Sequence, residues 1–232
     1  IAHCAALSSP AACESDPSGH DLANMTFSER LIHLAEHLDC HLCFTSSDLV
    51  FEASNPQGGG FTERDQPSCW SRYAKGKLAT ERLVGGLGAN GLSLRVCLVY
   101  GAPKGDARGN LAWILDALSD NRQVRLFCDE WRTPIYVSSL AHIIAISLET
   151  RASGLLHCGG TERVSRFEMG QALCQVMDFP EQLLLSVPQP VDGVPRRPSD
   201  VCLNSEQLYR SLGYIPMTLY DAYKQMRSEL GG

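Results

Sequence analysis

The sequence lacks the features that would point to a membrane, a nucleic acid or a secretory route. Its 232 residues contain 20 Lys and Arg against 26 Asp and Glu, and the basic residues are scattered rather than clustered. No apolar run reaches the roughly 18 residues that a membrane span requires. The start, "IAHCAALSS", has no basic segment before its apolar run and therefore does not read as a signal peptide. We expect neither a nucleic acid nor a membrane as a partner.

The cysteines do not form the dense framework of a small disulfide-rich protein, although there are ten of them. Several lie in apolar runs such as "RVCLVY" and "LLHCGG", where a thiol behaves as a small hydrophobe. We therefore expect reduced thiols in a cytoplasmic protein. Cys40 and Cys43 have His37 and His41 nearby but no second ligand pair at a suitable spacing, so we expect no metal site.

Short apolar runs alternate along the chain with segments of helical periodicity. The runs "IAHCAA", "CHLCFTSS", "LSLRVCLVY" and "GLLHCGG" predict buried strands at residues 1–6, 40–47, 92–100 and 154–160. Apolar residues at intervals of three and four predict helices over 23–38, 71–87 and 108–120. This alternation favours an α/β fold with a doubly wound parallel sheet.

The second part of the chain has a different character. Beyond residue 121 the predicted elements shorten and Pro becomes frequent. We predict one domain over residues 1–160 and a small C-terminal α+β lobe over residues 161–232. A strand in "WRTPIYV" and the helix that follows it, together residues 131–149, would bridge the two parts.

A Tyr and a Lys four residues apart occur twice, as Tyr73 and Lys77 and as Tyr220 and Lys224. Composition alone produces this spacing in roughly one such chain in ten, so the spacing does not identify a site. Residues four apart share a helix face, and a nearby ammonium lowers the pKa of a phenol from its usual value of about 10. The Tyr then becomes a usable general acid or base.

The residues upstream distinguish the two pairs. Before Tyr73, the strand in "FTSSDLVF" ends in the hydroxyls of Ser46 and Ser47, and ligands of a wound α/β sheet bind at the carboxyl ends of its strands. A hydroxyl there could share a substrate oxygen with the Tyr, as hydride transfer to a carbonyl requires. Tyr220 and Lys224 follow no such strand, so we expect them to pack on the surface of an amphipathic helix.

A strand that ends in Ser-Ser-Asp, followed by Tyr-x-x-x-Lys and "LRVCLVYG", resembles the extended short-chain dehydrogenase/reductase family. More narrowly, it is similar to the dTDP-4-dehydrorhamnose reductase-like branch, which also includes the beta regulatory subunit of methionine adenosyltransferase. "DEWRTP", "HCGGTERVSRFEMG" and "RRPSDVCLNSEQL" follow in the family's order, and Asn24 stands where the branch carries a helix Asn. The resemblance implies a Rossmann-like NAD(P)-binding domain over residues 1–160 and a substrate-binding lobe over residues 161–232.

The resemblance also implies a reaction, the NAD(P)H-dependent reduction of a nucleotide-linked 4-keto sugar. Ser47 would hold the substrate carbonyl oxygen and Tyr73 would donate a proton to it. Lys77 would hold the nicotinamide ribose and lower the pKa of Tyr73. The residues expected to contact NADP or NAD are Ala5, Ala6, Tyr73, Lys77, Tyr100 and Gly101.

Two arginines match residues that lie near the nucleotide-sugar phosphates in the family, Arg132 and Arg197. The planar guanidinium suits a diphosphate because it can bond two oxygens at once. An ion pair with Asp129 or Glu130 is an equally open interpretation of Arg132. Arg197 could equally be a solvated charge on a Pro-rich loop.

One departure from the family is large. Its members bind the dinucleotide pyrophosphate through a Gly-rich turn between the first strand and the first helix. The glycines at 58–60 and 85–91 do not follow a strand and open a helix. By the resemblance the chain begins at the fourth strand, with the first strands missing and an apolar sheet edge at "IAHCAA". We expect a fragment that binds NADP or NAD weakly or not at all by itself.

Two other functions stay open beside reduction. An epimerase could use the same scaffold, whereas dehydration is disfavoured because Ser47 is followed by Asp48 and Leu49 rather than by an acidic pair. A non-catalytic regulatory subunit is the alternative from another class, and its partner would be a synthetase. The partner could also be a second copy of the chain, in a homodimer.

Overall fold

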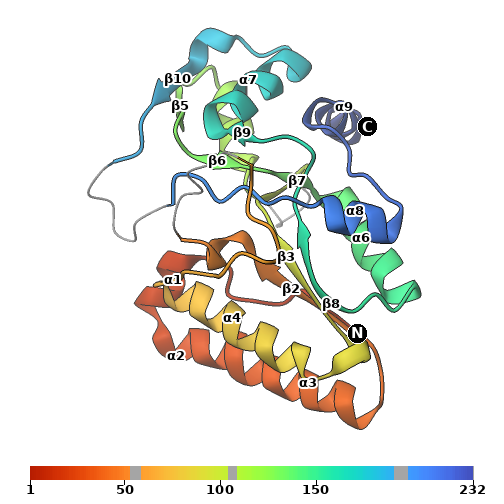
Figure 1. The fold of residues 1–232 in the computed structure, drawn as a ribbon. Coiled ribbons are helices and arrows are strands. Elements are labelled where there is room, and N and C mark those ends of the chain that lie inside the picture. The colour runs from red at the N-terminus through yellow and green to blue at the C-terminus, as the bar shows by residue number, and fades with distance from the viewer. Residues whose placement is uncertain (53–58, 104–108, 191–197, 232) are drawn as a thin grey trace.

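The central feature of the fold is a four-stranded parallel sheet in the order β1-β2-β3-β8 (Figure 1). The computed structural model describes residues 1–52, 59–103, 109–190 and 198–231. The four strands are Ala2–His3, Leu42–Ser47, Gly91–Val96 and Gly154–Cys158. All four lie within the predicted apolar runs or overlap them, so the predicted parallel α/β fold is confirmed. Among the described strands, β1 pairs with β2 alone and forms one edge of the sheet.

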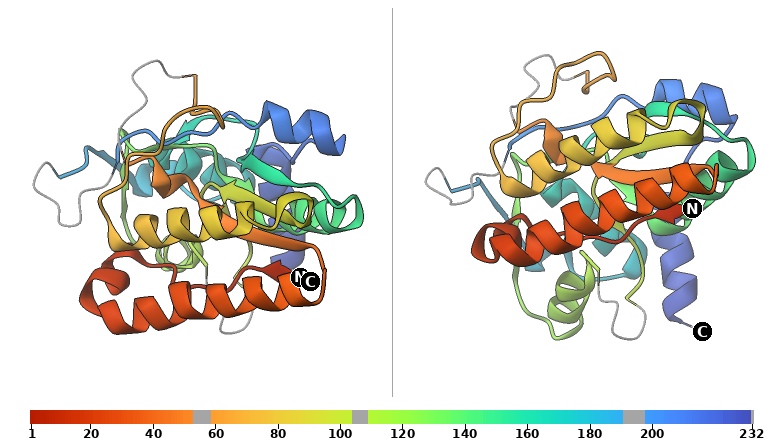
Figure 2. Two further views of the ribbon diagram at one scale, coloured as in Figure 1. Left: turned by 60° about the horizontal axis from the view of Figure 1, so that its bottom comes forward. Right: turned by 90° about the horizontal axis from the view of Figure 1, so that it is seen from below.

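Helices cover both faces of this sheet, as the predicted doubly wound fold requires (Figures 1 and 2). The helices are α3 and α4 on one face, at Phe27–His37 and Arg72–Gly85, and α6 and α8 on the other, at Val137–Glu149 and Glu206–Leu212. Phe44 of β2 packs with Ile32 and Val84 on the α3–α4 face. Leu94 of β3 packs with Ile143 on the opposite face. Within the described ranges, no helix is long and apolar enough to cross a membrane.

β2 and β3 are the best-buried strands of this sheet, and they bring the predicted site residues to one edge. Five of the six residues of β2 are buried, as are all six of β3. Such strands read as nearly continuous apolar runs because both faces are covered by helices. The parallel register pairs Ser47 with Val96 at the carboxyl ends of the two strands. Whatever follows these two strands therefore lies at one edge of the sheet.

A second hydrophobic core forms the upper part of the molecule in Figure 1. Its elements are α5, α7 and α9, at Ala112–Ser119, Arg166–Met177 and Leu219–Leu230, and the parallel pair β5 and β10, at Val124–Phe127 and Leu184–Val187. Leu118, Leu173 and Tyr223 are all buried in this core. The second core thus begins well before the expected boundary at residue 160, because α5 and β5 also contribute to it.

The strand predicted in "WRTPIYV" is divided into two short strands by Thr133 and Pro134, because proline has no N–H to donate to a ladder. The first piece, β6, pairs antiparallel with β9, and the second piece, β7, pairs parallel with β4. These four strands are Trp131–Arg132, Val164–Ser165, Ile135–Tyr136 and Val99–Tyr100. Short 3₁₀ turns complete the described elements, η2 at Asp48–Val50, η3 at Gly88–Asn90 and η4 at Glu181–Leu183.

The helical segment before α3 is longer than the sequence predicts. The extra elements are α1, α2 and a π-helical turn η1 that runs into α3, at Pro10–Ser15, Pro17–His20 and Asp21–Thr26. Ser9 and Asp16 cap the two short helices, and each is followed by a Pro at the first helical position. These are strong helix-start signals because the cap accepts a free N–H and the Pro has none to leave unpaired.

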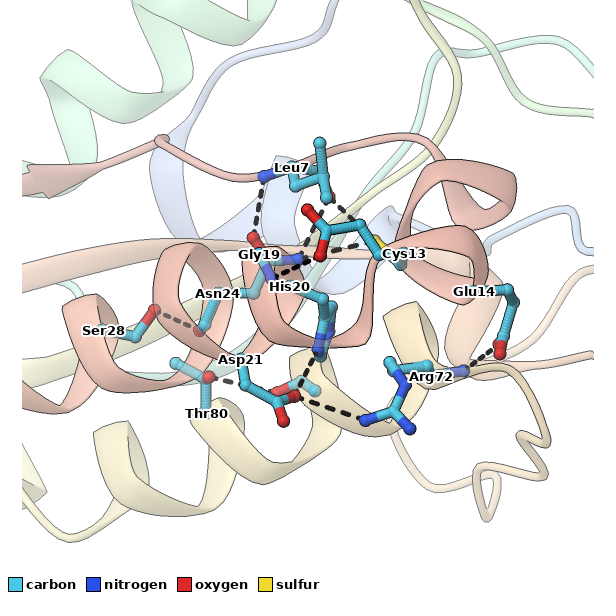
Figure 3. A network of polar contacts seen from close by, with 12 residues as sticks. Leu7, Cys13, Glu14, Gly19, His20, Asp21, Asn24, Ser28, Arg72 and Thr80 are labelled. Carbon is cyan, nitrogen blue, oxygen red and sulfur yellow. Dashed lines mark hydrogen bonds and ion pairs between the residues drawn. The ribbon is translucent and has the colours of Figure 1, made fainter.

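α2 approaches α4 closely at a glycine. A Cβ at Gly76 would lie 2.7 Å from Nε2 of His20 and 3.4 Å from Sδ of Met25. The His20 ring is buried, and the carboxylate of Asp21 holds its Nδ1 at 2.9 Å (Figure 3). The ring therefore cannot swing aside to make room for a side chain at position 76.

We predict that Gly76→Ala lowers the free energy of unfolding by about 1–3 kcal/mol, because the new methyl group overpacks the contact with His20. The matched control is Gly85→Ala at the end of the same helix, where an added Cβ meets nothing within 4 Å. That change should raise stability by roughly 0.5 kcal/mol through the lost backbone entropy of glycine. Urea unfolding measures both. Equal effects of the two substitutions would contradict this packing.

Candidate active site

A cavity of about 850 Å³ opens at the carboxyl ends of β2 and β3. Ser47 from β2 and Tyr73 and Lys77 from α4 all line it. Ligand cavities of enzymes commonly have about this size. The structure thus brings the three residues predicted as a catalytic group into one cavity, although they lie up to 30 positions apart in the sequence.

The first turn of α4 is held in place by side chains from two other segments. Ser71 caps the helix, and its own N–H donates to the carboxylate of Glu52 at 2.9 Å. The N–H of Arg72 donates to the carboxylate of Glu14 on α1 at 2.6 Å (Figure 3). Because the free N–H groups at a helix start need such acceptors, these contacts determine where the helix begins and where Tyr73 projects.

The hydroxyl of Ser47 is oriented by its neighbours. It accepts the N–H of Leu49 at 3.1 Å and donates to Oδ1 of Asp48 at 3.0 Å. It is also a hydrogen-bond partner of the Tyr73 phenol, a contact that works against the effect of burial on the phenol's pKa. Both side chains therefore meet at the wall of one cavity.

The electrostatics of Tyr73 differ from the prediction. Burial raises the pKa of Tyr73 to about 12, and Asp48 adds to the rise. The predicted lowering by Lys77 is wrong for this structure. Nζ of Lys77 lies 5.8 Å from the centre of the Tyr73 ring and donates to the carbonyl oxygen of Thr45 at 2.7 Å. The ammonium of Lys77 is bonded to β2 rather than to the phenol. Desolvation of the phenolate therefore determines the direction of the Tyr73 pKa shift.

The charged form of Lys77 is disfavoured by its buried surroundings. Its side chain is buried, and Nζ also lies 4.7 Å from the centre of the Phe44 ring. Burial lowers the pKa of Lys77 to about 8. The ammonium form still predominates at neutral pH, and burying this charge lowers the free energy of unfolding of the protein.

A buried acidic cluster lies next to Ser47. Burial raises the pKa of Asp48, and the thiol of Cys97 donates to its Oδ2 at 3.2 Å. Arg132 lines the cavity, but its guanidinium lies 3.8 Å from Asp48 and 3.5 Å from Glu130. The ion pair with Glu130, one of the two interpretations of Arg132, is therefore present. Arg197 lies outside the described residues.

The predicted cofactor contacts are only partly brought to the cavity. Ala6 lines it, whereas Ala5 is exposed and does not. Tyr100 is buried in the second core, 5.4 Å between ring centres from Tyr223, and neither it nor Gly101 is among the residues that line this cavity. The residues from Val96 to Val99 line the cavity instead, because the side chain of Tyr100 packs into the second core.

Asn24 holds the cavity wall formed by the loop after β1. It is buried in the π-helical turn, where its side-chain oxygen accepts the N–H of Leu7 at 2.7 Å and its amide donates to the carbonyl of Leu7 at 3.0 Å (Figure 3). The sequence places Asn24 in a helix but does not reveal this contact.

The other Tyr–Lys pair lies on the surface of α9, with Nζ of Lys224 stacked over the exposed ring of Tyr220 at 4.4 Å.

The lowered pKa of Lys77 leads to a pH-dependent prediction. The folded protein binds this proton less tightly than the unfolded chain, so the cost to stability is complete below pH 8 and is relieved as the pH rises toward 10.5. Lys77→Met removes that cost. Its gain in unfolding free energy over the native chain should be about 2–3 kcal/mol larger at pH 7 than at pH 10.

Urea unfolding at the two pH values measures this difference, and Lys224→Met on the exposed face of α9 is the control. The control should show no comparable pH dependence. A Lys77→Met gain that is the same at both pH values would contradict the account of the buried ammonium.

Two known proteins are similar to the chain along most of its length. It is 28% identical over 225 residues to the probable low-salt glycan biosynthesis reductase Agl14 of Haloferax volcanii, covering 95% of this chain and 74% of that protein. It is 29% identical over 217 residues to methionine adenosyltransferase 2 subunit beta of Rattus norvegicus, covering 90% of this chain. The chain spans 63% of the length of that second relative.

A solved structure shares the fold. The dTDP-4-dehydrorhamnose reductase of Bacillus anthracis in complex with NADP superimposes with a TM-score of 0.84 at 20% identity, over 99% of this chain and 80% of that one. The family model described as RmlD substrate binding domain matches residues 1–231. The chain therefore belongs to the RmlD substrate binding domain family.

Proposed function

We propose that this chain carries the catalytic centre of a reductase that uses NADPH or NADH to reduce a nucleotide-linked 4-keto sugar. The observation that carries the proposal is the convergence of Ser47, Tyr73 and Lys77 in one cavity. The similarity to a glycan biosynthesis reductase and to a dTDP-4-dehydrorhamnose reductase supports it.

Tyr73 is suited to give a proton rather than to take one. With its pKa raised to about 12 by burial, the phenol is protonated at neutral pH. A ketone oxygen that becomes an alkoxide is far more basic than a phenolate, so proton transfer from Tyr73 to that oxygen is downhill. The raised pKa therefore favours reduction of a ketone over oxidation of an alcohol.

Ser47 would hold the same oxygen. To donate to a substrate, its hydroxyl must rotate away from Asp48, while it goes on accepting the N–H of Leu49. A hydroxyl and a phenol that both donate to one developing oxyanion stabilise the transition state more than the ketone, because the charge appears only as the reaction proceeds. Asp48 would then keep the thiol of Cys97 as a partner.

The residues present fit the nicotinamide end of a dinucleotide. Lys77 would bond the ribose hydroxyls, and Ala6 would lie along the same part of the molecule, since both line the cavity. NADPH or NADH would supply the hydride when bound. The pyrophosphate end has no Gly-rich turn in this sequence, which is why we expect weak binding by residues 1–232 alone.

The sugar nucleotide would occupy the part of the cavity near the second core. Arg132, Asn110 and Gln189 line the cavity. Arg132 could serve the diphosphate only by exchanging its contacts with Asp48 and Glu130 for phosphate oxygens. We keep Arg132 and Arg197 as proposed substrate residues.

A regulatory subunit with a synthetase partner is the second proposal, and the similarity to methionine adenosyltransferase 2 subunit beta favours it. Intact site residues do not decide between the two, because a binding subunit can keep them without turnover. An epimerase on the same scaffold would use the same three residues. A homodimer is compatible with each of these functions.

The test is the reduction of a dTDP-4-keto sugar by the protein that contains this chain, followed as the loss of NADPH absorbance. Tyr73→Phe should lower kcat/KM by about 100-fold or more, because the proton donor is lost. Tyr220→Phe, from the surface pair on α9, is the matched control and should leave the rate unchanged. A Tyr73→Phe variant with full activity would refute the proposed chemistry. Capture of a synthetase without any reductase activity would favour the regulatory subunit.

A further inference from the structure

The polar face of α4 continues one turn beyond Lys77, at Glu81, a residue that the proposed chemistry does not use. Residues four apart stack on one face of a helix, so Tyr73, Lys77 and Glu81 lie in one row. The carboxylate of Glu81 is buried and accepts the hydroxyl proton of Ser46 at 2.5 Å. Three successive turns of α4 therefore contact three adjacent residues of β2, namely Ser47, Thr45 and Ser46.

Arg95 on the neighbouring strand β3 holds the same carboxylate with two parallel bonds. Its Nε lies 3.0 Å from Oε1 of Glu81, and its Nη2 lies 2.8 Å from Oε2. The two side chains are only 3% and 7% exposed. The guanidinium also lies 3.4 Å from Nε2 of His157 on β8 and 5.0 Å from the centre of the Phe51 ring. The carboxylate thus bonds directly to β2 and β3, and Arg95 links the pair to β8.

Such a pair adds little net stability, because the desolvation of two buried charges offsets their attraction. Its effect lies in geometry. A bidentate bond to Arg95 and a second bond to Ser46 admit one orientation of the Glu81 carboxylate. If α4 moved along β2 by a single residue, the contacts of Tyr73, Lys77 and Glu81 with the strand would all be lost together.

We propose that Glu81, oriented by Arg95, is a positioning residue that fixes α4 on β2 and thereby holds Lys77 at Thr45 and Tyr73 at Ser47. The consequence for turnover rests on the proposed function. The expected change in the environment of Lys77 is independent of the proposed function, because it concerns only the folded protein.

The pKa of the Lys77 ammonium depends on the position of Glu81. Burial lowers the pKa of the ammonium, and electrostatic interactions with Cys4, Glu81 and Cys13 act in the opposite direction. His3 on β1 also faces it, since Lys77 contributes to the lowered pKa of that ring, and Tyr73 lies beside it on α4. Glu81 is the carboxylate in this set, one helical turn from Lys77. Loss of its charge should therefore leave the ammonium less favoured.

The experiment is a pH titration of the lysine side chains by carbon-13 NMR in the native chain and in Glu81→Gln. The chain has four lysines, at 75, 77, 104 and 224, and Lys77→Arg assigns the signal by removing it. We expect the pKa of Lys77 to fall by about half a unit to one unit in Glu81→Gln. Glu36→Gln on α3 is the control, because this carboxylate is 71% exposed. A shift no larger than that of the control overturns the proposal.

Glu81→Gln leaves the Arg95 guanidinium buried without its charge partner, and such a change can prevent folding. The variant Glu81→Gln with Arg95→Gln removes both charges and keeps polar side chains at both positions. Of the two, Glu81 acts on the pKa of Lys77, so the pKa should fall in the double variant as well. A folded double variant with the native pKa at Lys77 would overturn the proposal.

Turnover separates this inference from the proposed function. In Glu81→Gln, kcat should fall while the KM for the sugar nucleotide changes little, because the proton donor rather than a substrate contact is displaced. If the NMR titration shifts while Tyr73→Phe keeps full activity, the reductase proposal fails and the positioning role stands. If Tyr73→Phe abolishes reduction and the titration does not shift, the positioning role fails alone.

Discussion

The packing of the polar face of α4 on the end of β2 is the interaction on which the candidate site depends. A helix normally turns apolar residues toward a sheet. Here Tyr73 and Lys77 occupy that face, and their polar atoms reach the Ser47 hydroxyl and the Thr45 carbonyl. The rest of the fold supports this contact: β2 is held between covered faces, the loop after β1 is pinned by Asn24, and the start of α4 is bonded by Glu52 and Glu14.

Burial, rather than the nearby cation, determines how this site behaves. It raises the pKa of Tyr73 to about 12 and lowers that of Lys77 to about 8. Each neutral form is favoured because a charge loses its hydration inside the protein. The same contact therefore creates a proton donor and lowers stability, a trade-off that is common where a protein does chemistry. A site assembled for stability alone would place apolar side chains on this face.

Much of this arrangement is predictable from the sequence, since it follows from local patterns. Apolar runs locate the sheet strands, and the hydroxyl-tipped strand before Tyr73 singles out one Tyr–Lys pair from two. What the sequence does not reveal depends on tertiary packing. The direction of the Tyr73 pKa shift, the burial of Tyr100 in the second core and the contact of Asn24 with Leu7 all require the positions of residues far apart in the chain. The parallel pairing of β5 with β10 joins segments about 60 residues apart and has no local signal.

The most direct test of the central contact is a double-mutant cycle on unfolding free energy with Ser47→Ala, Tyr73→Phe and the variant that carries both. It needs no substrate or cofactor. Each single change removes one of the two oxygens, and the cycle isolates the energy of their contact. The account predicts a coupling of about 0.5–1.5 kcal/mol between the two positions. Strictly additive effects would show that the two hydroxyls do not meet, and the convergence on one substrate oxygen would then be wrong.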